Sequence, residues 1–432
     1  MTAPHHARVP IAGGDARVLV ARGDADVPIA RGDVDVLVAG GGVAGLTATA
    51  AFAAAGFRAV CVDPVPPITS AEAEGSDLRS TAFLMPAVGL LGRAGLWERL
   101  APHAAPLRVM RLADAGGAPG IVRTSADFDS AEIGAAAFGY NLPNWLLRRE
   151  MVAHIAEAER AELRAGVRVT DVTPRTDAAL VALSDGTQVR ARLVVAADGR
   201  DSAVREALGI GARRWGYGQK AVVFTVAHAA PHGGASIEIH RTGGPFTLVP
   251  LPDRGAEPAS SVVWMETGPR AAALAALPEA EFNAALAARA CGVLGAIRAT
   301  SPRRVWPIIS QIADRLDGPR TALVAEAAHV VPPIGAQGLN MSLADLATLL
   351  DLAAGAEDIG APDLLARYHR RRHREIGLRV AGIDALNRAA MAEPRPLRDL
   401  RRAGLAALHG LPPLRHAAMR LGLGGQSPWL RG

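Results

Sequence analysis

Short apolar blocks alternate with glycine-rich turns along the first part of the chain. The block at 34–39 is followed by three glycines, a small-residue stretch at 43–55 with helical spacing, and a second apolar block at 57–63. This order predicts a strand–helix–strand unit of a parallel sheet. The uncharged stretch 36–57 is as long as a bilayer-crossing helix, but its five glycines and its change of period predict a strand and a helix instead of a membrane span.

Further apolar and alternating runs cover most of the chain. We expect strands at 107–113, 119–124, 167–173, 179–184, 187–195, 221–227, 236–240, 246–251, 261–265 and 304–312. We expect helical stretches that end at Leu100 and Leu163, and helices at 268–276, 278–290 and 362–391. The strands of a second sheet fall between pieces of the first unit. This arrangement predicts two interleaved domains of mixed α/β (α+β) class.

The domain boundaries follow from this interleaving. We assign the Rossmann-like domain to 34–105, 145–214 and 318–391, and the β-sheet domain to 106–144 and 215–317. Residues 1–33 repeat a Gly-Asp motif before short apolar runs, which predicts a poorly ordered extension. Residues 392–432 hold Pro394, Pro396, Pro412 and Pro413 between short helical patterns and are expected to form a helical tail.

Three glycines in the first turn have the spacing of a dinucleotide-binding loop. Gly40, Gly42 and Gly45 form Gly-x-Gly-x-x-Gly between a predicted strand and helix, and Asp63 ends the next predicted strand. The glycines permit a tight turn, close approach of the backbone to a pyrophosphate, and close helix–strand packing. A carboxylate at the position of Asp63 accepts hydrogen bonds from a ribose diol.

Two later turns also follow apolar runs. Residues 326–340 are rich in Gly and Pro and precede a helical pattern, so they form either a cradle of backbone N–H groups for an anion or a plain strand-to-helix turn. Asp198 and Gly199 follow the apolar run that ends at Ala197. The carboxylate of Asp198 either points over the sheet or belongs to an Asp-Gly turn before a helix that Ser202 caps.

Composition narrows the class of protein. The chain has 432 residues, of which 50% are hydrophobic and 21% charged, with a net charge of +5 and a pI near 9.9. Lys220 is the only lysine among 47 Lys and Arg residues, so the arginines reflect a composition bias. Aromatic residues make up 4%, and no nucleic-acid recognition motif is present. Cys61 and Cys291 have no metal-type spacing, which predicts a reducing compartment and no metal site.

The three turns, in this order, resemble the single-component FAD-dependent aromatic hydroxylases, a family that includes p-hydroxybenzoate hydroxylase and the ubiquinone-biosynthesis hydroxylases. The resemblance covers about residues 34–390. The stretches 128–134, 139–144 and 243–251 are more similar to the ubiquinone branch, whereas Pro332-Pro333 and 335–338 depart from it. The resemblance implies a p-hydroxybenzoate-hydroxylase-like fold, FAD as cofactor and NAD(P)H as co-substrate.

The resemblance also assigns residues to the cofactor. Gly40, Gly42, Gly45 and Asp63 match the ADP-binding motif, Asp198 and Gly199 match the Asp-Gly motif, and Arg79 and Asn144 match contacts of the FAD phosphates and ribityl chain. Backbone N–H groups near Gly338, Leu339 and Asn340 are expected to meet the N1–C2=O edge of the flavin, which becomes negative on reduction. The family loop normally opens with Gly-Asp, whereas this chain has Ala325-Glu326. Glu326 keeps the charge on a longer side chain, which leaves the FAD affinity open.

The activity implied by the resemblance is hydroxylation of an aromatic ring with NAD(P)H and O₂. We expect an apolar phenol such as a polyprenylated one in ubiquinone biosynthesis. Two alternatives are a hydroxylase of a small aromatic acid, anchored by Lys220 or Arg241, and a non-catalytic subunit of a quinone-biosynthesis complex. No catalytic acid or base is assigned. His329 is either a proton relay or a structural histidine, and the carbonyl of Pro333 is expected to face the active oxygen.

The basic run 369–374 and the arginine-rich tail leave two interpretations open. An amphipathic basic tail rests on an anionic bilayer, where a greasy substrate is found, or it is a solvated helical face. No secretion signal precedes the first strand, so we expect a cytoplasmic protein, peripheral on the inner face of the membrane in the first interpretation.

Overall fold

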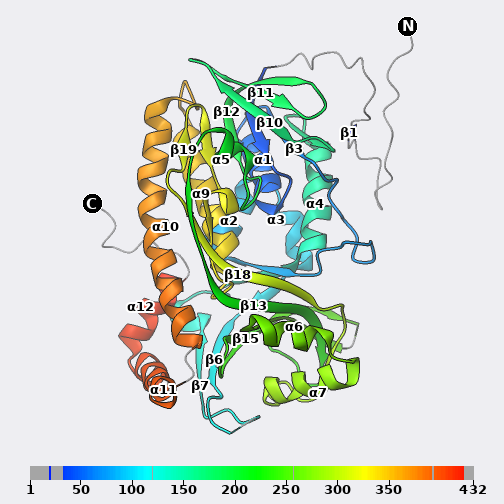
Figure 1. The fold of residues 1–432 in the computed structure, drawn as a ribbon, viewed down its shortest axis with the longest axis vertical. Helices are drawn as coiled ribbons and strands as arrows, with labels where there is room; N and C mark the ends of the chain where they lie inside the picture. The colour runs from blue at the N-terminus through cyan, green and yellow to red at the C-terminus, as the bar shows by residue number, and fades with distance from the viewer. Residues whose placement is uncertain (1–18, 21–32, 119, 256, 392–393, 423–432) are drawn as a thin grey trace.

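The computed structural model describes residues 19–20, 33–118, 120–255, 257–391 and 394–422 (Figure 1). Two nine-stranded sheets and one three-stranded sheet are present in these residues. The first sheet is largely parallel and the second mainly antiparallel, so the predicted α/β (α+β) class is confirmed. The extension expected at 1–33 lies almost entirely outside the described residues.

The parallel sheet contains the predicted strand–helix–strand unit. β2 (Val34–Ala39) leads into α1 (Val43–Ala54), and β3 (Ala59–Asp63) pairs in parallel with β2. α1 has nine buried residues out of twelve, because small side chains let it pack closely on its neighbours. The uncharged stretch 36–57 is therefore a strand, a turn and a helix, as predicted. No helix in the described ranges is both long enough and apolar enough to cross a bilayer.

The order of the first sheet is β1-β9-β3-β2-β12-β11-β10, and β20 pairs with β12 and β19. Its remaining strands are β1 (Leu19–Val20), β9 (Ala161–Ala165), β10 (Val169–Pro174), β11 (Ala179–Leu183), β12 (Gln188–Ala196), β19 (Asp317–Gly318) and β20 (Thr321–Leu323). The helical stretch predicted to reach Leu163 is wrong. α4 (Asn144–Glu157) ends earlier, because residues 161–165 are needed as a parallel partner of β3.

The second sheet has the order β21-β18-β13-β16-β15-β14-β6-β7, with β17 beside β13. Its strands are β6 (Val109–Asp114), β7 (Thr124–Asp129), β13 (Ala212–His228), β14 (Ala235–His240), β15 (Pro245–Arg254), β16 (Glu257–Thr267), β17 (Ile297–Ala299), β18 (Arg304–Ala313) and β21 (His329–Val330). α6 (Gly268–Ala276) and α7 (Glu279–Ala290) cover one face around Phe224 and Phe282, whose rings lie 5.0 Å apart (Figure 1). The strand expected at 119–124 begins only at Thr124.

The structure also contains a small third sheet, which the pattern did not predict. Its strands alternate along the chain with strands of the second sheet. It consists of β4 (Ser80–Leu84), β8 (Gly139–Pro143) and β5 (Ala105–Leu107) in the order β4-β8-β5. β4 occupies part of the stretch that was expected to be helical. The helical segments that follow it are α2 (Met85–Arg93), α3 (Trp97–Leu100) and η1 (Ala101–His103), and η2 (Ser130–Ile133) follows β7.

The C-terminal helices connect the two large sheets. α5 (Ala203–Ala207) and α8 (Ala325–Ala328) follow strands of the first sheet, and α9 (Gln337–Ala353) follows β21 of the second. α10 (Pro362–Met391) runs along the side of the molecule toward the second sheet (Figure 1). Near its end, Asp384 accepts a hydrogen bond from Tyr217 Oη of β13 at 2.6 Å. α11 (Arg395–Gly410) and α12 (Pro412–Gly422) pack beside β6 and β7. The assigned domain boundaries stay a prediction.

Candidate functional site

The three turns singled out in the sequence lie at one edge of the first sheet. β3, β2, β12 and β20 are consecutive parallel neighbours, so their carboxyl ends meet. The register aligns Ala39 with Ala196, and Ala196 with Leu323. Ligands of open α/β sheets bind beyond the carboxyl ends of the strands. The turns that begin at Gly40, after Ala197 and after Leu323 therefore border one site.

The glycine loop is held together by contacts that exclude side chains at two of its positions. Gly40 has φ +105°, and a Cβ there would lie 2.4 Å from the Ala197 carbonyl oxygen. A Cβ on Gly45 would lie 1.7 Å from the Gly40 carbonyl oxygen. By contrast, a Cβ on Gly42 would meet no atom within 4 Å. Gly40 and Gly45 thus serve packing, and Gly42 leaves open space in front of the loop.

Asp63 lies against the same loop. Its Oδ2 accepts a hydrogen bond from the Gly41 backbone N–H at 2.6 Å, and its Oδ1 accepts one from the Val65 N–H at 2.8 Å. These bonds fix the carboxylate at the end of β3. The position agrees with the predicted contact with a ribose.

The structure agrees with the second alternative for Asp198, an Asp-Gly turn before a helix that Ser202 caps. Asp198 accepts hydrogen bonds from Ser202 Oγ at 2.5 Å and from the Val204 N–H at 3.1 Å, so its carboxylate is directed to the start of α5. Gly199 has φ +92°, and a Cβ there would meet no atom within 4 Å. Gly199 therefore faces open space, as Gly42 does.

Glu326 links the Asp-Gly turn to the 326–340 turn. Its carboxylate is half-exposed and pairs with the Arg200 guanidinium at 3.0 Å. Arg205 Nη1 donates to the Ala327 carbonyl at 2.9 Å, and Gln311 Nε2 donates to the Arg200 carbonyl at 3.0 Å. Ala325, where the family normally has glycine, is in the left-handed region with φ +55°. The two turns thus form one bonded unit.

Arg79 and Asn144 meet around a carboxylate that the sequence did not single out. Asp77 accepts two hydrogen bonds from the Arg79 guanidinium, both at 2.8 Å, and one from Asn144 Nδ2 at 3.0 Å. Burial raises the pKa of Asp77, but the hydrogen bonds and charges of Arg79, Asn144 and Arg148 outweigh it and lower the pKa to about 2. The negative charge on Asp77 holds Arg79 in place.

Arg79 also contacts the second sheet. Its guanidinium carbon lies 4.5 Å from the ring centroid of Trp306 in β18. Burial lowers the pKa of Arg79, but the hydrogen bond and charge of Asp77, together with the charge of Glu326, outweigh it and raise the pKa. Arg79, Glu326 and Trp306 therefore border the same space from three different segments. Neither Asp77 nor Trp306 was predicted. The spacing of Asp77 and Arg79 in the sequence could have indicated that Asp77 pairs with Arg79. By contrast, nothing in the sequence indicates that Trp306 contacts Arg79.

The first turn of α9 lies against β4, close to Arg79. Asn340 Oδ1 accepts a hydrogen bond from the Leu84 N–H at 2.8 Å, and its Nδ2 donates to the Ala82 carbonyl at 2.7 Å. Leu339 packs against the main core, and a Cβ on Gly338 would meet only Val331, at 4.0 Å. The helix start thus keeps an open side at Gly338, where backbone N–H groups are available to an anion.

Two further residues of the turn were named as candidates. Pro333 is exposed between the buried residues Pro332 and Ile334, and the role of its carbonyl stays a prediction. His329 is buried, with Nε2 2.7 Å from Asp345 Oδ2. Both Asp345 and Arg372, which pairs with it, were missed because their sequence positions carry no recognisable motif. This geometry supports the structural reading of His329.

The arrangement fits an extended dinucleotide and offers nothing for a metal. The open positions at Gly42, Gly199 and Gly338 belong to the three turns at this edge. Among the described residues no group of three His, Cys, Asp or Glu side chains has the geometry of a metal site.

This geometry agrees with the comparisons with known proteins. Residues 33–381 match the FAD binding domain family, so the chain belongs to that family. The chain is 37% identical over 384 residues to the ubiquinone hydroxylase UbiL of Rhodospirillum rubrum, which covers 88% of this chain and 87% of the relative. It is 26% identical to 3-demethoxyubiquinol 3-hydroxylase of Escherichia coli, over 85% of this chain and 93% of the relative. The predicted resemblance to the ubiquinone branch is confirmed.

Solved structures show the same fold. The p-nitrophenol 4-monooxygenase PnpA from Pseudomonas putida DLL-E4 aligns with a TM-score of 0.73 at 19% identity, covering 91% of this chain and 99% of that one. HpxO of Klebsiella pneumoniae, complexed with FAD and uric acid, aligns with a TM-score of 0.71 at 19% identity, covering 91% and 98%. The predicted interleaved flavin monooxygenase fold is confirmed.

The contrast between two glycines gives a test of the site. Gly45→Ala places a Cβ against the Gly40 carbonyl and is expected to destabilise the protein by about 3 kcal/mol or more, because backbone must move. Gly42→Ala meets no protein atom and is expected to leave the melting temperature within about 2 °C. It is nevertheless expected to weaken FAD binding at least about tenfold, because the methyl group occupies space meant for the pyrophosphate. Thermal unfolding and FAD titration measure both effects, and unchanged FAD affinity in Gly42→Ala would contradict the assignment.

Proposed function

We propose that the protein hydroxylates the aromatic ring of an apolar phenol, with FAD as cofactor and NAD(P)H and O₂ as co-substrates. The observation that carries this proposal is the convergence of the turns at Gly40, Asp198 and Glu326 on one sheet edge. A nicotinamide dehydrogenase would use the first turn alone. The membership in the ubiquinone hydroxylase branch supports the same reaction class.

Different residues are assigned to different parts of FAD. Gly40, Gly42 and Asp63 hold the ADP part, and Arg79 and Asn144 hold the phosphates and ribityl chain. Flavin, when bound, supplies the activation of O₂ and the transfer of one oxygen atom to the ring.

The protein contributes placement and charge at the flavin ring. The N-terminus of α9 near Gly338 lies at the flavin edge, and its partial positive charge is worth about 0.5–2 kcal/mol toward an anion there. The buried side chains of Pro332 and Ile334 help to keep water from the reacting atoms. Glu326, held by Arg200, is placed to accept a hydrogen bond from a ribityl hydroxyl.

The position of two cations favours an apolar substrate over a small aromatic acid. Lys220 of β13 lies opposite Glu266 of β16, and two positions further along, Val222 lies opposite Trp264. Residues two positions apart in a strand face the same side of the sheet. The side chains of Val222 and Trp264 lie in the core under α6 and α7. Arg241 is near Arg289 of α7. Burial chiefly lowers the pKa of Arg289 to about 10, and the charge of Arg241 contributes to the lowering. Both candidate carboxylate anchors thus belong to the helix-covered side of the second sheet.

Substrate-stimulated NAD(P)H oxidation separates the two substrate classes. The FAD-loaded protein is expected to oxidise NAD(P)H at least about tenfold faster with a prenylated phenol than without it, because substrate binding releases binding energy for the reductive step. Small aromatic acids such as hydroxybenzoate are expected to stimulate less than about twofold, since Lys220 and Arg241, the two cations considered as carboxylate anchors, belong to the helix-covered side of the second sheet. The opposite order of stimulation would assign the protein to the soluble-acid hydroxylases.

The exposed face of the C-terminal helices supports a peripheral membrane contact. Leu405 and Leu408 of α11 and Met419 of α12 pack on the second sheet. On the outside the two helices expose a set of leucines: Leu397, Leu400, Leu411, Leu414 and Leu421. Exposed arginines at 402 and 420 accompany them. Apolar side chains beside cations fit the surface of an anionic bilayer on the inner face of a membrane, where a greasy phenol is found.

Vesicle binding tests this contact. The double variant Leu400→Glu, Leu414→Glu is expected to bind anionic phospholipid vesicles at least about tenfold more weakly, because each change removes about 1–2 kcal/mol of apolar burial and adds repulsion. Val65→Glu, which changes an equally exposed side chain outside these helices, is the matched control. Equal co-sedimentation of wild type, the double variant and a chain lacking 392–432 would remove the membrane contact and favour a protein complex or a solvated face.

A further inference from the structure

A continuous series of polar contacts joins the two ends of the turn between α8 and α9. We call it the polar chain. Its members, in order of contact, are His329, Asp345, Arg372, Glu375, Arg379 and Gln337. The series leaves the turn at His329, crosses to α10, and returns to the turn at Gln337. None of the three members on α10, Arg372, Glu375 and Arg379, belongs to the residues assigned to FAD.

The inner half of the polar chain is centred on Asp345, whose side chain has no solvent exposure. Its Oδ2 lies 2.7 Å from His329 Nε2 and accepts a weaker bond from the Ala325 N–H at 3.4 Å, while its Oδ1 accepts from Arg372 Nε at 2.8 Å. Burial raises the pKa of Asp345, but His329 and Arg372 outweigh it and lower the pKa below the ordinary value. Asp345 is therefore charged, and it holds both ends of the segment 325–329.

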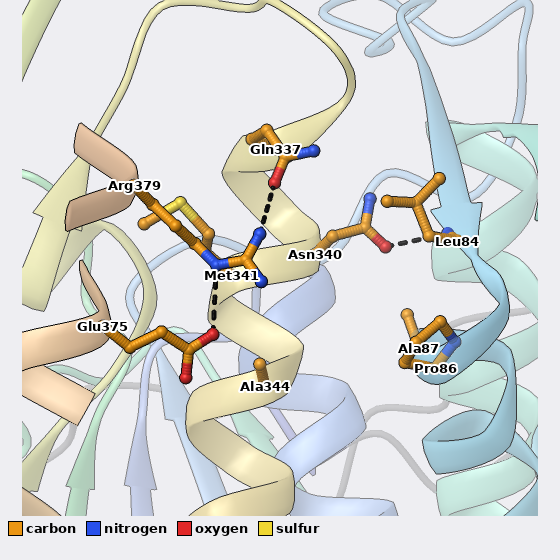
Figure 2. A pocket seen from close by; sticks show the side chains of 9 residues that line it. All are labelled: Leu84, Pro86, Ala87, Gln337, Asn340, Met341, Ala344, Glu375 and Arg379. Carbon is orange, nitrogen blue, oxygen red and sulfur yellow. Dashed lines mark hydrogen bonds and ion pairs between the residues drawn. The ribbon is translucent and has the colours of Figure 1, made fainter. Parts of the chain in front are cut away.

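The outer half lies in a pocket between α2, α9 and α10 (Figure 2). Arg372 also pairs with Glu375 one turn further along α10. Arg379 Nε donates to Glu375 Oε1 at 3.0 Å, and its Nη1 donates to Gln337 Oε1 at 3.0 Å. Figure 2 shows Arg379 lying between these two partners. Gln337 is the first residue of α9, so this contact fixes the helix start.

The turn itself has few internal bonds to set its shape. Pro332 and Pro333 have no N–H to donate, and the Ile334 N–H closes only a tight turn onto the Pro332 carbonyl at 2.8 Å. Ala325 and Ala336 bracket the turn in the left-handed region, with φ +55° and +56°. Alanine adopts this conformation at a cost, so contacts outside the turn must hold it there.

The pair of Asp345 and Arg372 is buried, and such pairs seldom increase stability over apolar packing, because each charge loses its hydration. The pair of Glu375 and Arg379 is partly exposed and contributes little stability of its own. Their effect is to fix geometry, and here the fixed geometry is that of the turn under the flavin. We propose that Arg379 and Glu375 are positioning residues, which set the shape of residues 325–337 and thereby the efficiency with which oxygen reaches the substrate. The proposal concerning oxygen transfer rests on the proposed function, whereas the shape of the turn is testable without it.

Hydrogen exchange of the FAD-free protein tests the shape. In Arg379→Gln, amides of peptides covering 325–340 are expected to exchange about tenfold faster, because the charge-assisted bonds of Arg379 to Glu375 and to Gln337 are lost. Arg93→Gln is the matched control, since it breaks a 2.7 Å ion pair from α2 to Asp351 at the other end of α9. Arg379→Lys retains a charge beside Glu375 and is expected to recover part of the protection. Glu375→Gln removes the other partner and is expected to match Arg379→Gln.

The FAD-loaded protein provides the second readout. Arg379→Gln is expected to direct at least about threefold more of the consumed NAD(P)H to hydrogen peroxide, with a changed visible circular dichroism of the flavin, because the turn no longer holds the ring in one place. Arg93→Gln should keep the wild-type ratio. Equal exchange of 325–340 in Arg379→Gln and Arg93→Gln would overturn the proposal. If no variant hydroxylates any phenol while the exchange difference persists, the proposed function fails and the positioning of the turn stands.

Discussion

The hydrogen-bonded register of β3, β2, β12 and β20 is the constraint on which the site depends. Each strand is followed by a turn that contributes to the site, and parallel pairing brings these turns to one edge. A register slip of one residue would turn the buried side chains of β2 to the wrong face. The nearly continuous burial of β2, β3 and β20 makes such a slip costly. Segments more than a hundred residues apart are thereby placed side by side.

The turns are then fixed by polar contacts of two kinds. At the edge, Glu326 and Arg200 form a partly exposed pair, which is screened by solvent and contributes little stability. Beneath the turn, Asp345 and Arg372 are almost completely buried, and removing either would leave an uncompensated charge. The buried pair therefore constrains the turn far more than the exposed one. Rigidity is thus concentrated under the turn where we propose that the flavin edge lies, and there small displacements would alter oxygen transfer most.

Much of this organisation could be predicted from local patterns. The apolar block at 34–39, the small-residue helix after it and the spacing of Gly40, Gly42 and Gly45 each have one physical explanation, and all appear in the structure. The helix at 362–391 was predicted with its observed bounds. Such features depend only on neighbours in the sequence.

The features that were missed depend on distant partners. The local sequence pattern of β9 predicts the end of a helix, but these residues form a strand because they pair with β3. β4 was not predicted as a strand, because its partner β8 lies far along the chain. The contacts of Asp77, Trp306 and Asp345 join segments that no periodicity relates. The carboxylate of Asp198 turns back onto its own helix, which the sequence left as one of two alternatives.

The central claim is that one flavin lies across the edge formed by these turns. The visible absorption spectrum of the purified protein after incubation with FAD and removal of free cofactor tests it most directly. The account predicts the visible absorption bands of oxidised flavin at about one FAD per chain. A colourless protein that FAD cannot reconstitute, although it is folded, would contradict the account and favour a non-catalytic subunit.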